Sequence, residues 1–560
     1  MSTALEAASL IMVPSGYSDG MLGSVKPTDS SGNFTFTRGT DIGATRVAED
    51  GYIEKGRENL LLQSNQFDES YWQKNNGCSI IGQTATDPFG VTNNAWLVAF
   101  DGTTNARLEK NFSGSAIKTM SVYVRAQSGT QEVLIGFGSS ELVAKTITTT
   151  WQRIEKFTPT GNVYPRLRCD DVVTLEVFGF QVELGLAATE YIESGATTGT
   201  AGILANLPRI DYTGGGCGSL LLEGSRTNRI PNSEYYQSFA NYGTGNSVFE
   251  SNAAVSPDNT QNAYKIILNI GKANGGGAVS TLAGAFTTGD IIAFSIFFKA
   301  DEFDEVDIGG YFANESARFN LTDGSVISQK SNVINAYSVP FGDGWYRCTV
   351  IYTFQNHVGN NFLYSGYKVI ATSNGVASAG DGVKGAFAYG AQFEVGTYPT
   401  SYIPTYGTSV TRAVDDVELP TLSSVFDSSG DYTILFEVER LAAPNESQFF
   451  YIRSSSFNYI TLSAASGGKC EIVLFDGATA ASATTPTNSF ITGSSIKIAV
   501  KISGNNCSAF VNGAVLTLNN TNTIPRGFDR YQNNRNHRKH QEVYFSTALS
   551  DAELAELTTI

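Results

Sequence analysis

Flat aromatic rings and planar polar side chains occur together along this chain, and sugar recognition needs that combination. An aromatic face packs on the apolar side of a sugar ring, while amides, carboxylates and guanidinium groups bind its hydroxyls. In the strand expected at 121–126, alternation puts Tyr123 and Arg125 on one face, opposite Val122 and Val124. We expect this face to line a concave glycan site. The predicted glycan-binding residues are Tyr71, Trp72, Trp96, Arg107, Tyr123 and Arg125, with Phe297 and Lys299 in the places of Tyr123 and Arg125 further along the chain.

A structural role for the same aromatic residues stays open on sequence alone. Tyr123 and Trp96 would fit a hydrophobic core, and Arg125 would fit a solvated strand position. Trp151 and Trp345 recur at matching places in two similar segments, which favours a role in the fold for both.

Basic residues concentrate shortly before the end of the chain. This cluster predicts docking onto an acidic partner or a charged glycan, with a solvated loop as the alternative. Its members are Arg526, Arg530, Arg535, Arg538 and Lys539.

Metal and cofactor chemistry has little support in the sequence. The run Asp301–Asp307 holds five acids but lacks the glycine that an EF-hand loop requires, so a solvated acidic turn is expected there. We predict no resident cofactor and leave calcium open as a structural ion.

Catalytic motifs are also missing. The chain has three histidines, and it shows no GxSxG elbow, HExxH pair or phosphate-binding loop. We therefore expect no enzyme. A glycosidase stays open as an alternative, since two carboxylates about 5–9 Å apart in space leave no pattern in a sequence.

Composition points to an all-β protein. Of 560 residues only 16% are charged, 11% are aromatic and 57 are glycine, which suits strands and tight turns better than helical bundles. The net charge of −16 disfavours binding to nucleic acid. No apolar run reaches the length of a membrane span. Six widely spaced cysteines indicate reduced thiols and synthesis in a reducing cytoplasm.

The chain contains an internal duplication. Five blocks recur in the same order, which predicts two copies of one module built from short strands. The first copies are Arg57–Ser64, Ser121–Ala126, Trp151–Arg153, Gln181–Gly185 and Tyr191-Ile192; the second copies are Arg226–Ser233, Ser295–Ala300, Trp345–Arg347, Gln392–Gly396 and Tyr402-Ile403.

The motifs resemble those of two known groups of domains. Val543–Leu554, with the hairpin turn Val511–Gly513 before it, resembles the end of laminin-G/concanavalin-A-like domains. The blocks Asn59–Ser64 and Gln392–Thr405 resemble carbohydrate-binding jelly rolls of bacteriophage virion proteins. The run Pro14–Ile53 looks like the leader of phage tail-fibre or head-fibre proteins.

Together these observations predict an all-β chain of tandem jelly-roll β-sandwich modules plus a concanavalin-A-like sandwich. The predicted parts are an N-terminal virion-attachment segment 1–55, module 1 at 56–195, a linker 196–223, module 2 at 224–406, a linker 407–420 and a C-terminal domain 421–560.

The resemblance implies a structural virion protein of a tail or head fibre, made in the bacterial cytoplasm and displayed on the virion surface. Its expected partners are other virion proteins, bound through an N-terminal segment that orders on a partner or on another copy, and a host-surface glycan. A homo-oligomer is expected, a trimer among the options, with no nucleic acid and no membrane insertion. The alternatives are an architectural decoration protein that binds no sugar and, third, a glycan-degrading enzyme.

Overall fold

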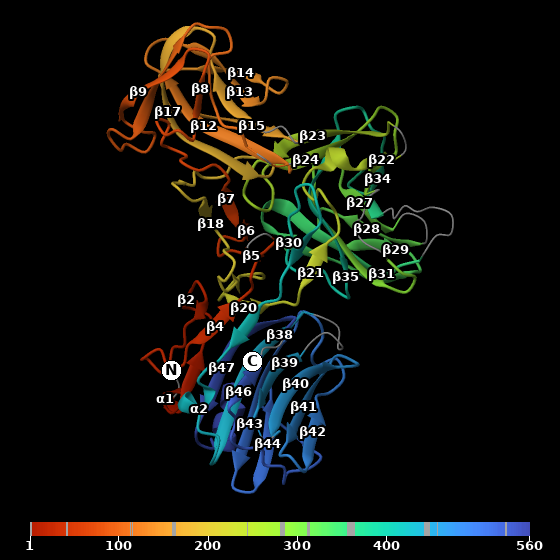
Figure 1. Cartoon of the computed structure of the whole chain (residues 1–560). Helices are drawn as coiled ribbons and strands as arrows, with labels where there is room; N and C mark the ends of the chain where they lie inside the picture. Colours follow the sequence, from red (N-terminus) through yellow and green to blue (C-terminus); the bar gives the residue numbers. More distant parts are fainter. Residues whose placement is uncertain are drawn as a thin grey trace.

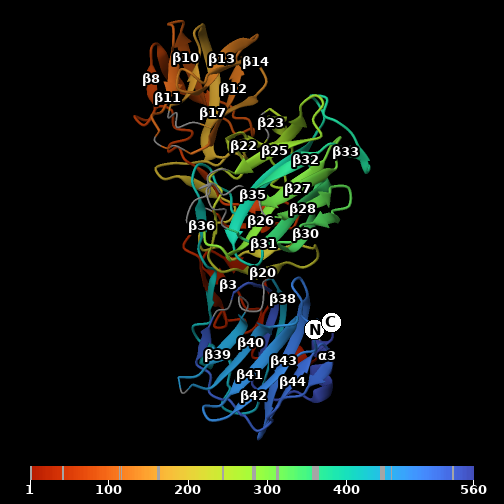
Figure 2. The ribbon, with the colours of Figure 1, turned by 90° about the vertical axis from the view of Figure 1, so that its right-hand side faces the viewer.

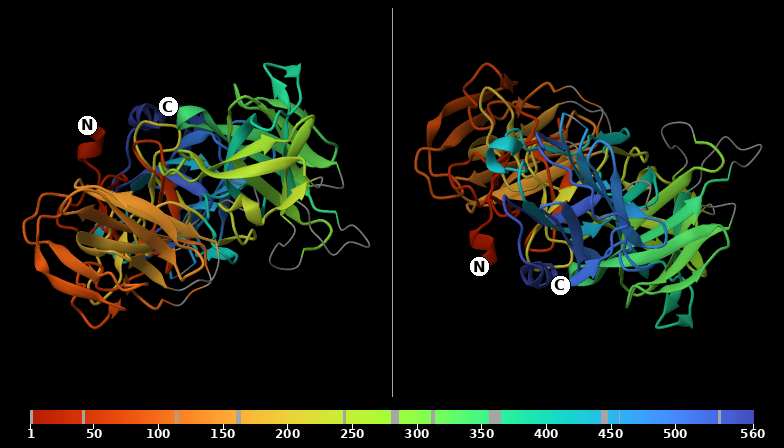
Figure 3. Two further views of the ribbon diagram at one scale, coloured as in Figure 1. Left: turned by 90° about the horizontal axis from the view of Figure 1, so that it is seen from above. Right: turned by 90° about the horizontal axis from the view of Figure 1, so that it is seen from below.

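The computed structural model describes residues 3–40, 43–112, 114, 116–159, 164–242, 245–279, 286–310, 314–355, 365–441, 448–455, 457–532 and 535–560. Strands dominate it, and they form three β-sandwiches stacked along one long axis (Figure 1). Module 1 lies at one end, module 2 in the middle and the C-terminal domain at the other end, and a quarter turn shows the same order (Figure 2). Seen along this axis, the two modules lie to opposite sides (Figure 3). The all-β prediction is confirmed.

Module 1 is a sandwich of two five-stranded antiparallel sheets. Apolar side chains at alternate positions, such as Val98, Val122 and Val177, point inward and meet Ile135 and Leu167 of the second sheet. The first sheet has the order β15(Gln152–Thr158)-β12(Lys118–Ala126)-β17(Val172–Leu184)-β10(Ala95–Asp101)-β9(Cys78–Ala85), and the second β14(Val143–Ile147)-β13(Gln131–Phe137)-β16(Pro165–Arg168)-β11(Arg107–Glu109)-β8(Gln73–Asn75).

Module 2 repeats this plan with two six-stranded sheets. One has the order β22(Ala240–Tyr242)-β25(Asn274–Val279)-β32(Ser365–Ile370)-β27(Glu305–Gly310)-β28(Glu315–Asn320)-β29(Val326–Gln329). The other is β23(Ser247–Ala254)-β24(Ala263–Leu268)-β35(Gly385–Val395)-β26(Ile291–Ala300)-β31(Trp345–Thr353)-β30(Val333–Phe341). Beside them lie β33(Thr372–Ser373), β34(Val376–Ala377) and the 3-10 turns η1(Tyr236–Ser238) and η2(Gly342–Gly344).

The duplication is visible in the backbone. The pairing of β12 with β17 shifts register between Ser121 and Tyr123, and that of β26 with β35 shifts at the matching place in module 2. Gly179 and Gly390 lie at these bulges, with φ of 62° and 60°. A Cβ on Gly179 would lie 3.0 Å from the Tyr191 ring, so glycine suits both the φ and the space.

The C-terminal domain is a sandwich of an eight-stranded and a five-stranded sheet. A helix follows Ser550, α3(Asp551–Thr558), which begins with a capping box between Ser550 and Glu553. The larger sheet contains β19(Ile210–Asp211)-β20(Ser219–Leu222)-β47(His537–Phe545)-β38(Tyr432–Arg440)-β43(Ser495–Ser503)-β44(Asn506–Val511)-β45(Ala514–Leu516), with β1(Leu10–Met12) also on β47. The smaller contains β42(Ala480–Thr484)-β41(Lys469–Phe475)-β40(Tyr459–Ala465)-β39(Gln448–Arg453)-β46(Arg530–Gln532).

The leader, residues 3–40 and 43–55, packs on this chain itself, which corrects the expectation that it orders on a partner or on another copy. Strand β1 extends the large sheet of the C-terminal domain, because Leu10 and Met12 fill the same core as Leu220 and Tyr544. The remaining leader elements are α1(Thr3–Glu6), β2(Tyr17–Ser18), β3(Met21–Leu22), β4(Phe34–Thr37), β5(Thr45–Val47) and β6(Ile53–Lys55).

The two segments expected as linkers also form strands. From 196–223, β19 and β20 join the large C-terminal sheet, and β18(Gly199–Ala201) pairs with β7(Arg57–Asn59). From 407–420, β36(Val410–Arg412) pairs with β21(Arg226–Asn228) and β37(Asp416–Glu418) pairs with β4. The short helix α2(Leu422–Val425) then leads into the C-terminal domain. Neither segment is a free tether.

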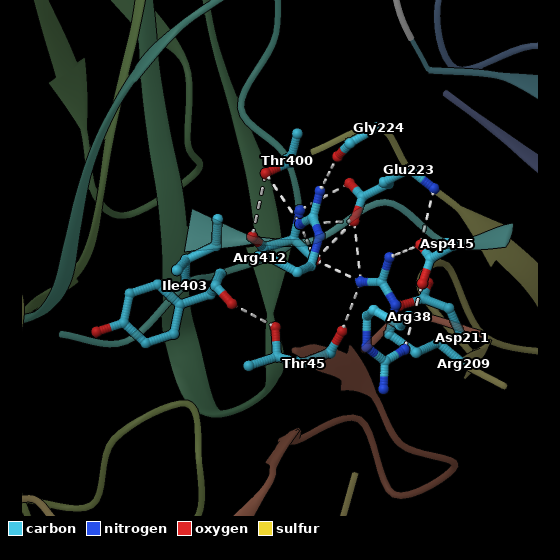
Figure 4. Close-up of polar contacts among 12 residues, drawn as sticks. Arg38, Thr45, Arg209, Asp211, Glu223, Gly224, Thr400, Ile403, Arg412 and Asp415 are labelled. Carbon is cyan, nitrogen blue, oxygen red and sulfur yellow. Dashed lines mark hydrogen bonds and ion pairs between the residues drawn. The ribbon is translucent and has the colours of Figure 1, made fainter. Parts of the chain in front are cut away.

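A buried ion network fixes these segments to one another (Figure 4). The carboxylate of Asp415 binds Arg209 and lies 3.2 Å from Nη1 of Arg38. Glu223 pairs with Arg209 at 2.9 Å and with Arg412 at 3.0 Å. All five side chains are at most 2% exposed, so each charge depends on its partners in place of water.

The network predicts acid sensitivity. Burial alone would raise the pKa of the Glu223 carboxyl, but Arg412 and Arg209 overcome this and lower it from 4.5 to about 2. The folded state therefore binds the proton more weakly than the unfolded chain. The resulting stability, on the order of 3 kcal/mol, is complete above about pH 4.5 and is lost as the pH falls through about 2.

Denaturant unfolding between pH 7 and pH 2.5 measures this loss. The matched variant Glu223→Gln should show a flatter decline across the same pH range, because its side chain does not titrate. If the unfolding free energies of the two proteins fall equally with pH, Glu223 is not the source of the acid sensitivity.

Candidate functional site

An aromatic cluster covers the outer face of the first sheet of module 1. Tyr123 is half-buried, and its ring centre lies 5.7 Å from that of Phe89, which is 64% exposed. Phe178 lies 5.9 Å from Phe89 and 5.2 Å from Tyr191. Alternation along β12 puts Tyr123 on this face while Val122 and Val124 enter the core, as the sequence predicted.

This cluster borders a cleft of about 940 Å³ at the junction of the two modules, which we call the module-1 cleft. The facing walls come from the turn 258–261, which connects β23 and β24 of module 2, and from the leader segment 48–55. In Figure 1 the orange sandwich of module 1 meets the green sandwich of module 2 near β23 and β24. Its polar lining consists of Asp50, Tyr52, Glu54, Lys55, Arg57, Arg153, Thr189, Glu190, Asp258, Asn259, Thr260 and Gln261.

Arg153 lines the module-1 cleft, and the sequence reasoning did not include it among the candidate residues. It lies opposite Tyr123 in the pairing of β12 with β15, and its guanidinium carbon is 5.2 Å from the centre of the Tyr123 ring. Nη2 donates to Oγ of Ser121 at 2.9 Å and Nη1 donates to the carbonyl of Thr189. Among the described residues, no carboxylate lies within 4.0 Å of this guanidinium. The Trp-x-Arg block was interpreted as part of the fold, although its arginine follows Trp151 at the spacing that puts it on the outer face.

Lys55 forms the base of the module-1 cleft. It contacts Asp258, lies 3.1 Å from Glu234, and donates to the hydroxyls of Tyr389 and Tyr406 at 3.3 and 3.2 Å. Burial alone would raise the pKa of Asp258, but Lys55 and the neighbouring hydrogen bonds lower it to about 2. This cluster joins the leader to module 2, and so it fixes the segment 48–55 against the turn 258–261 in the wall that faces module 1.

The repeated sequence blocks form a hydrogen-bonded clamp in each module. The buried amide of Asn59 donates to the carbonyls of Phe180 and Ile192, and Asn228 makes the same pair of bonds in module 2. Similarly, Gln181 binds Glu183 at 2.8 Å and Gln392 binds Glu394 at 2.7 Å. These residues hold the chain as it leaves the module, so their recurrence reflects the fold and not a shared ligand.

Two of the predicted sugar-binding residues belong to the core, and this part of the prediction is wrong. Trp72 and Trp96 are 2% and 7% exposed, and both pack against Phe67. Their indole N–H groups donate to the carbonyls of Gln63 and Asn65, at 2.8 Å each. Neither ring has a face left for a sugar.

Phe297 is also wrong as a sugar platform. Only 1% of it is exposed, because Ile53 of the leader and the rings of Trp345 and Tyr402 cover the face that corresponds to the aromatic cluster of module 1. Lys299 stays half-buried on the same strand and does not line the module-1 cleft.

The remaining predicted residues do not gather with Tyr123. Arg125 shares its face but binds Glu176 at 2.6 Å and lies over Trp151. Tyr71, which lies under Lys110, and Arg107, which pairs with Glu109 at 2.8 Å, lie away from the module-1 cleft. Their predicted role remains a prediction.

The basic residues near the C-terminus do not form one docking patch. Lys539 is 1% exposed and binds Glu542, while Arg538 pairs with Asp211 at 3.1 Å and with Glu439 at 2.8 Å. Both are wrong as docking residues. Arg526 is half-buried and donates to backbone carbonyls at 429, 430 and 504, and Arg530 and Arg535 are exposed.

The predicted acidic turn pairs with basic side chains of its own module. Lys265 contacts Asp301 and Glu302, and Arg318 lies 3.5 Å from Glu305. Within the described ranges, no group of three His, Cys, Asp or Glu side chains is arranged to hold a metal ion. No helix in the described part of the chain is long and apolar enough to cross a membrane.

Comparison with known proteins adds distant structural likenesses. No family model matches the sequence. No curated protein matches it either. One similar solved structure is the carbohydrate-binding module CBM40 of a Ruminococcus gnavus sialidase, bound to sialyllactose. It is 16% identical with a TM-score of 0.21, and the match covers 24% of this chain and 84% of the module.

Two further structures cover more of the chain. The tandem CBM22 domains of Paenibacillus barcinonensis Xyn10C have 10% identity and a TM-score of 0.21, over 64% of this chain and 99% of theirs. The LG1–3 region of the laminin alpha2 chain has 11% identity and a TM-score of 0.18, over 80% of this chain and 96% of its own. TM-scores this low carry no argument, so the description of the chain as tandem β-sandwiches rests on its own strand topology.

Proposed function

We propose that this protein is a lectin-like adhesin, a structural component of a bacteriophage tail or head fibre that binds a host-surface glycan in the module-1 cleft. The observation that carries the sugar-binding part is the aromatic cluster of Phe89, Tyr123 and Tyr191 beside a guanidinium that has no ion pair among the described residues. Phe89 and Tyr123 offer ring surface to the apolar side of a sugar. Arg153, Asn259 and Gln261 offer planar polar groups to its hydroxyls.

The geometry also suits binding without turnover. The walls of the module-1 cleft come from two sandwiches of hydrogen-bonded strands and from the leader, so little ordering is needed when a glycan enters. Individual sugar contacts are weak. Several copies on one particle would raise the overall affinity, because binding of one copy increases the effective concentration of the next. The virion location and the oligomer are part of the proposal, and they rest on the resemblance of the leader and the modules to phage fibre proteins.

Alanine substitution tests the sugar-binding part. Tyr123→Ala should lower affinity for host polysaccharide or for a positive spot on a glycan array about tenfold, because a stacked ring contributes about 1.4 kcal/mol. Phe89→Ala should act in the same direction without destabilising the fold, since Phe89 is 64% exposed. The matched control is Lys299→Ala, which lies on the corresponding strand of module 2 and should leave affinity unchanged.

Three outcomes separate the alternatives. Equal affinity of the wild-type protein and both aromatic variants, with normal unfolding curves, would contradict the module-1 cleft as the glycan site. Binding to phage particles but not to host cells would favour an architectural decoration protein. Release of reducing sugar from host polysaccharide would establish an enzyme.

A further inference from the structure

A second cavity, of about 290 Å³, lies between module 2 and the C-terminal domain, and we call it the junction pocket. Module 2 contributes the outer face of β30 and β31 and the segment 398–402, including Tyr337, Arg347 and Tyr398. The C-terminal domain contributes Glu439, Leu441, Thr492, Gly493 and Arg538, and the leader adds residues 45–47 and Ile53. Three parts of the chain therefore meet around this partly open pocket.

Arg347 is the charge in this pocket that lacks a counter-ion. Its Nε and Nη2 both donate to Oγ of Ser295, at 3.2 and 3.1 Å. Within the described ranges, no carboxylate lies within 4.0 Å of its guanidinium. Burial lowers the pKa of Arg347, and among its charged neighbours Glu394 opposes this most strongly. The Glu394 carboxylate accepts hydrogen bonds from Gln392 and Thr400 in the clamp of module 2, and it forms no ion pair with Arg347.

The other charged side chains around the junction pocket already have partners. Arg538 binds Asp211 and Glu439, and Arg46 binds Glu54 at 2.8 Å. Glu223 belongs to the buried network with Arg209 and Arg412. One positive charge, that of Arg347, is therefore left over on the wall of the pocket.

From this we infer that the junction pocket binds a compact carboxylate-bearing ligand, whose acid group pairs with Arg347. A guanidinium binds a carboxylate through two parallel N–H bonds, and the association is strong where water is excluded. The hydroxyls of Tyr398, Thr400 and Ser401 already donate to Asn536, Glu394 and Glu223, so Arg347 is the group that selects the ligand, and the rest of the molecule lies against the pocket wall. The volume suits a ligand of about the size of one sugar acid, which distinguishes this site from the larger module-1 cleft.

The position of the pocket adds a consequence for stability. A ligand held between module 2 and the C-terminal domain binds only the assembled arrangement, so it should raise the unfolding temperature of the full chain. The inference does not depend on glycan binding in the module-1 cleft, because Arg347 lines the junction pocket and not that cleft.

Calorimetric titration of the full chain with glucuronate, glucose and acetate tests the inference. Glucuronate should bind and raise the unfolding temperature, while glucose should bind at least tenfold more weakly because it lacks the acid. Acetate binding as tightly as glucuronate would indicate an ion site without a place for a sugar ring, and it would overturn the size assignment. Glucuronate binding no tighter than glucose would overturn the role of the acid group.

Two variants and one control localise the binding. Arg347→Gln should lose at least tenfold in glucuronate affinity. Thr492→Trp fills the pocket from an exposed position of the C-terminal domain, so it should abolish binding even if Arg347→Gln folds poorly. Arg318→Gln, on the other sheet of module 2, should leave binding unchanged. Wild-type affinity in the folded Arg347→Gln and Thr492→Trp proteins would overturn the inference.

Discussion

Replacing Asp415 by alanine is expected to lower the free energy of unfolding by about 3–5 kcal/mol, the usual cost of removing one partner from a buried ion network. Arg38 and Arg209 would then lose the carboxylate that they share. Glu223 would be the one remaining acid of the network. The backbone N–H of Glu223 would also lose the carboxylate that it donates to at 2.9 Å. Because Arg38 belongs to the leader and Arg209 to the strand-forming segment 196–223, the leader around Arg38 should loosen from that segment, while β1 stays paired with β47.

Denaturant unfolding with limited proteolysis measures both effects. The proteolysis should cut residues 30–40 of Asp415→Ala well before any part of the wild-type protein. Arg318→Ala is the matched control, since its ion pair with Glu305 is partly exposed and should contribute less than about 1 kcal/mol. A loss below 1 kcal/mol in Asp415→Ala would contradict the role given to the network.

The second large effect is expected at Lys55. Lys55→Met keeps the length of the side chain but leaves Glu234 and Asp258 as two buried carboxylates without their cation, which should cost about 3–5 kcal/mol. The same change should weaken glycan binding, because Lys55 joins the leader to module 2 at the base of the module-1 cleft.

A compensated variant separates charge from packing. Lys55→Met combined with Glu234→Gln and Asp258→Asn removes the uncompensated charge, so it should recover most of the lost stability. Unfolding free energies of the single and triple variants make the comparison. If the triple variant is as unstable as Lys55→Met alone, Lys55 stabilises the fold through its packing and not through its charge.

The sequence was informative where the fold depends on local patterns. Alternation along 121–126 correctly separated Tyr123 and Arg125 from Val122 and Val124, and self-comparison found the duplicated module. Each of these features depends on residues close to one another in the chain or on a comparison of like segments.

Long-range contacts were beyond such patterns. Leu10 pairs with Tyr544 across almost the whole chain, so the leader gave no sign that it completes a sheet of the C-terminal domain. Tryptophan is a residue type that sugar-binding sites use, but the packing of two sheets buries Trp72 and Trp96. Phe297 matches Tyr123 in sequence, but Ile53 of the leader covers it. Arg153 gains its position in the module-1 cleft from the turn 258–261 of the other module.

The location of a bound sugar tests the central claim most directly. Crystals of the full chain soaked with an oligosaccharide that it binds should show a sugar ring against Tyr123 and Phe89, with a hydroxyl within hydrogen-bond distance of Arg153. Sugar bound instead on the C-terminal domain, with the module-1 cleft empty at saturating concentration, would contradict the account.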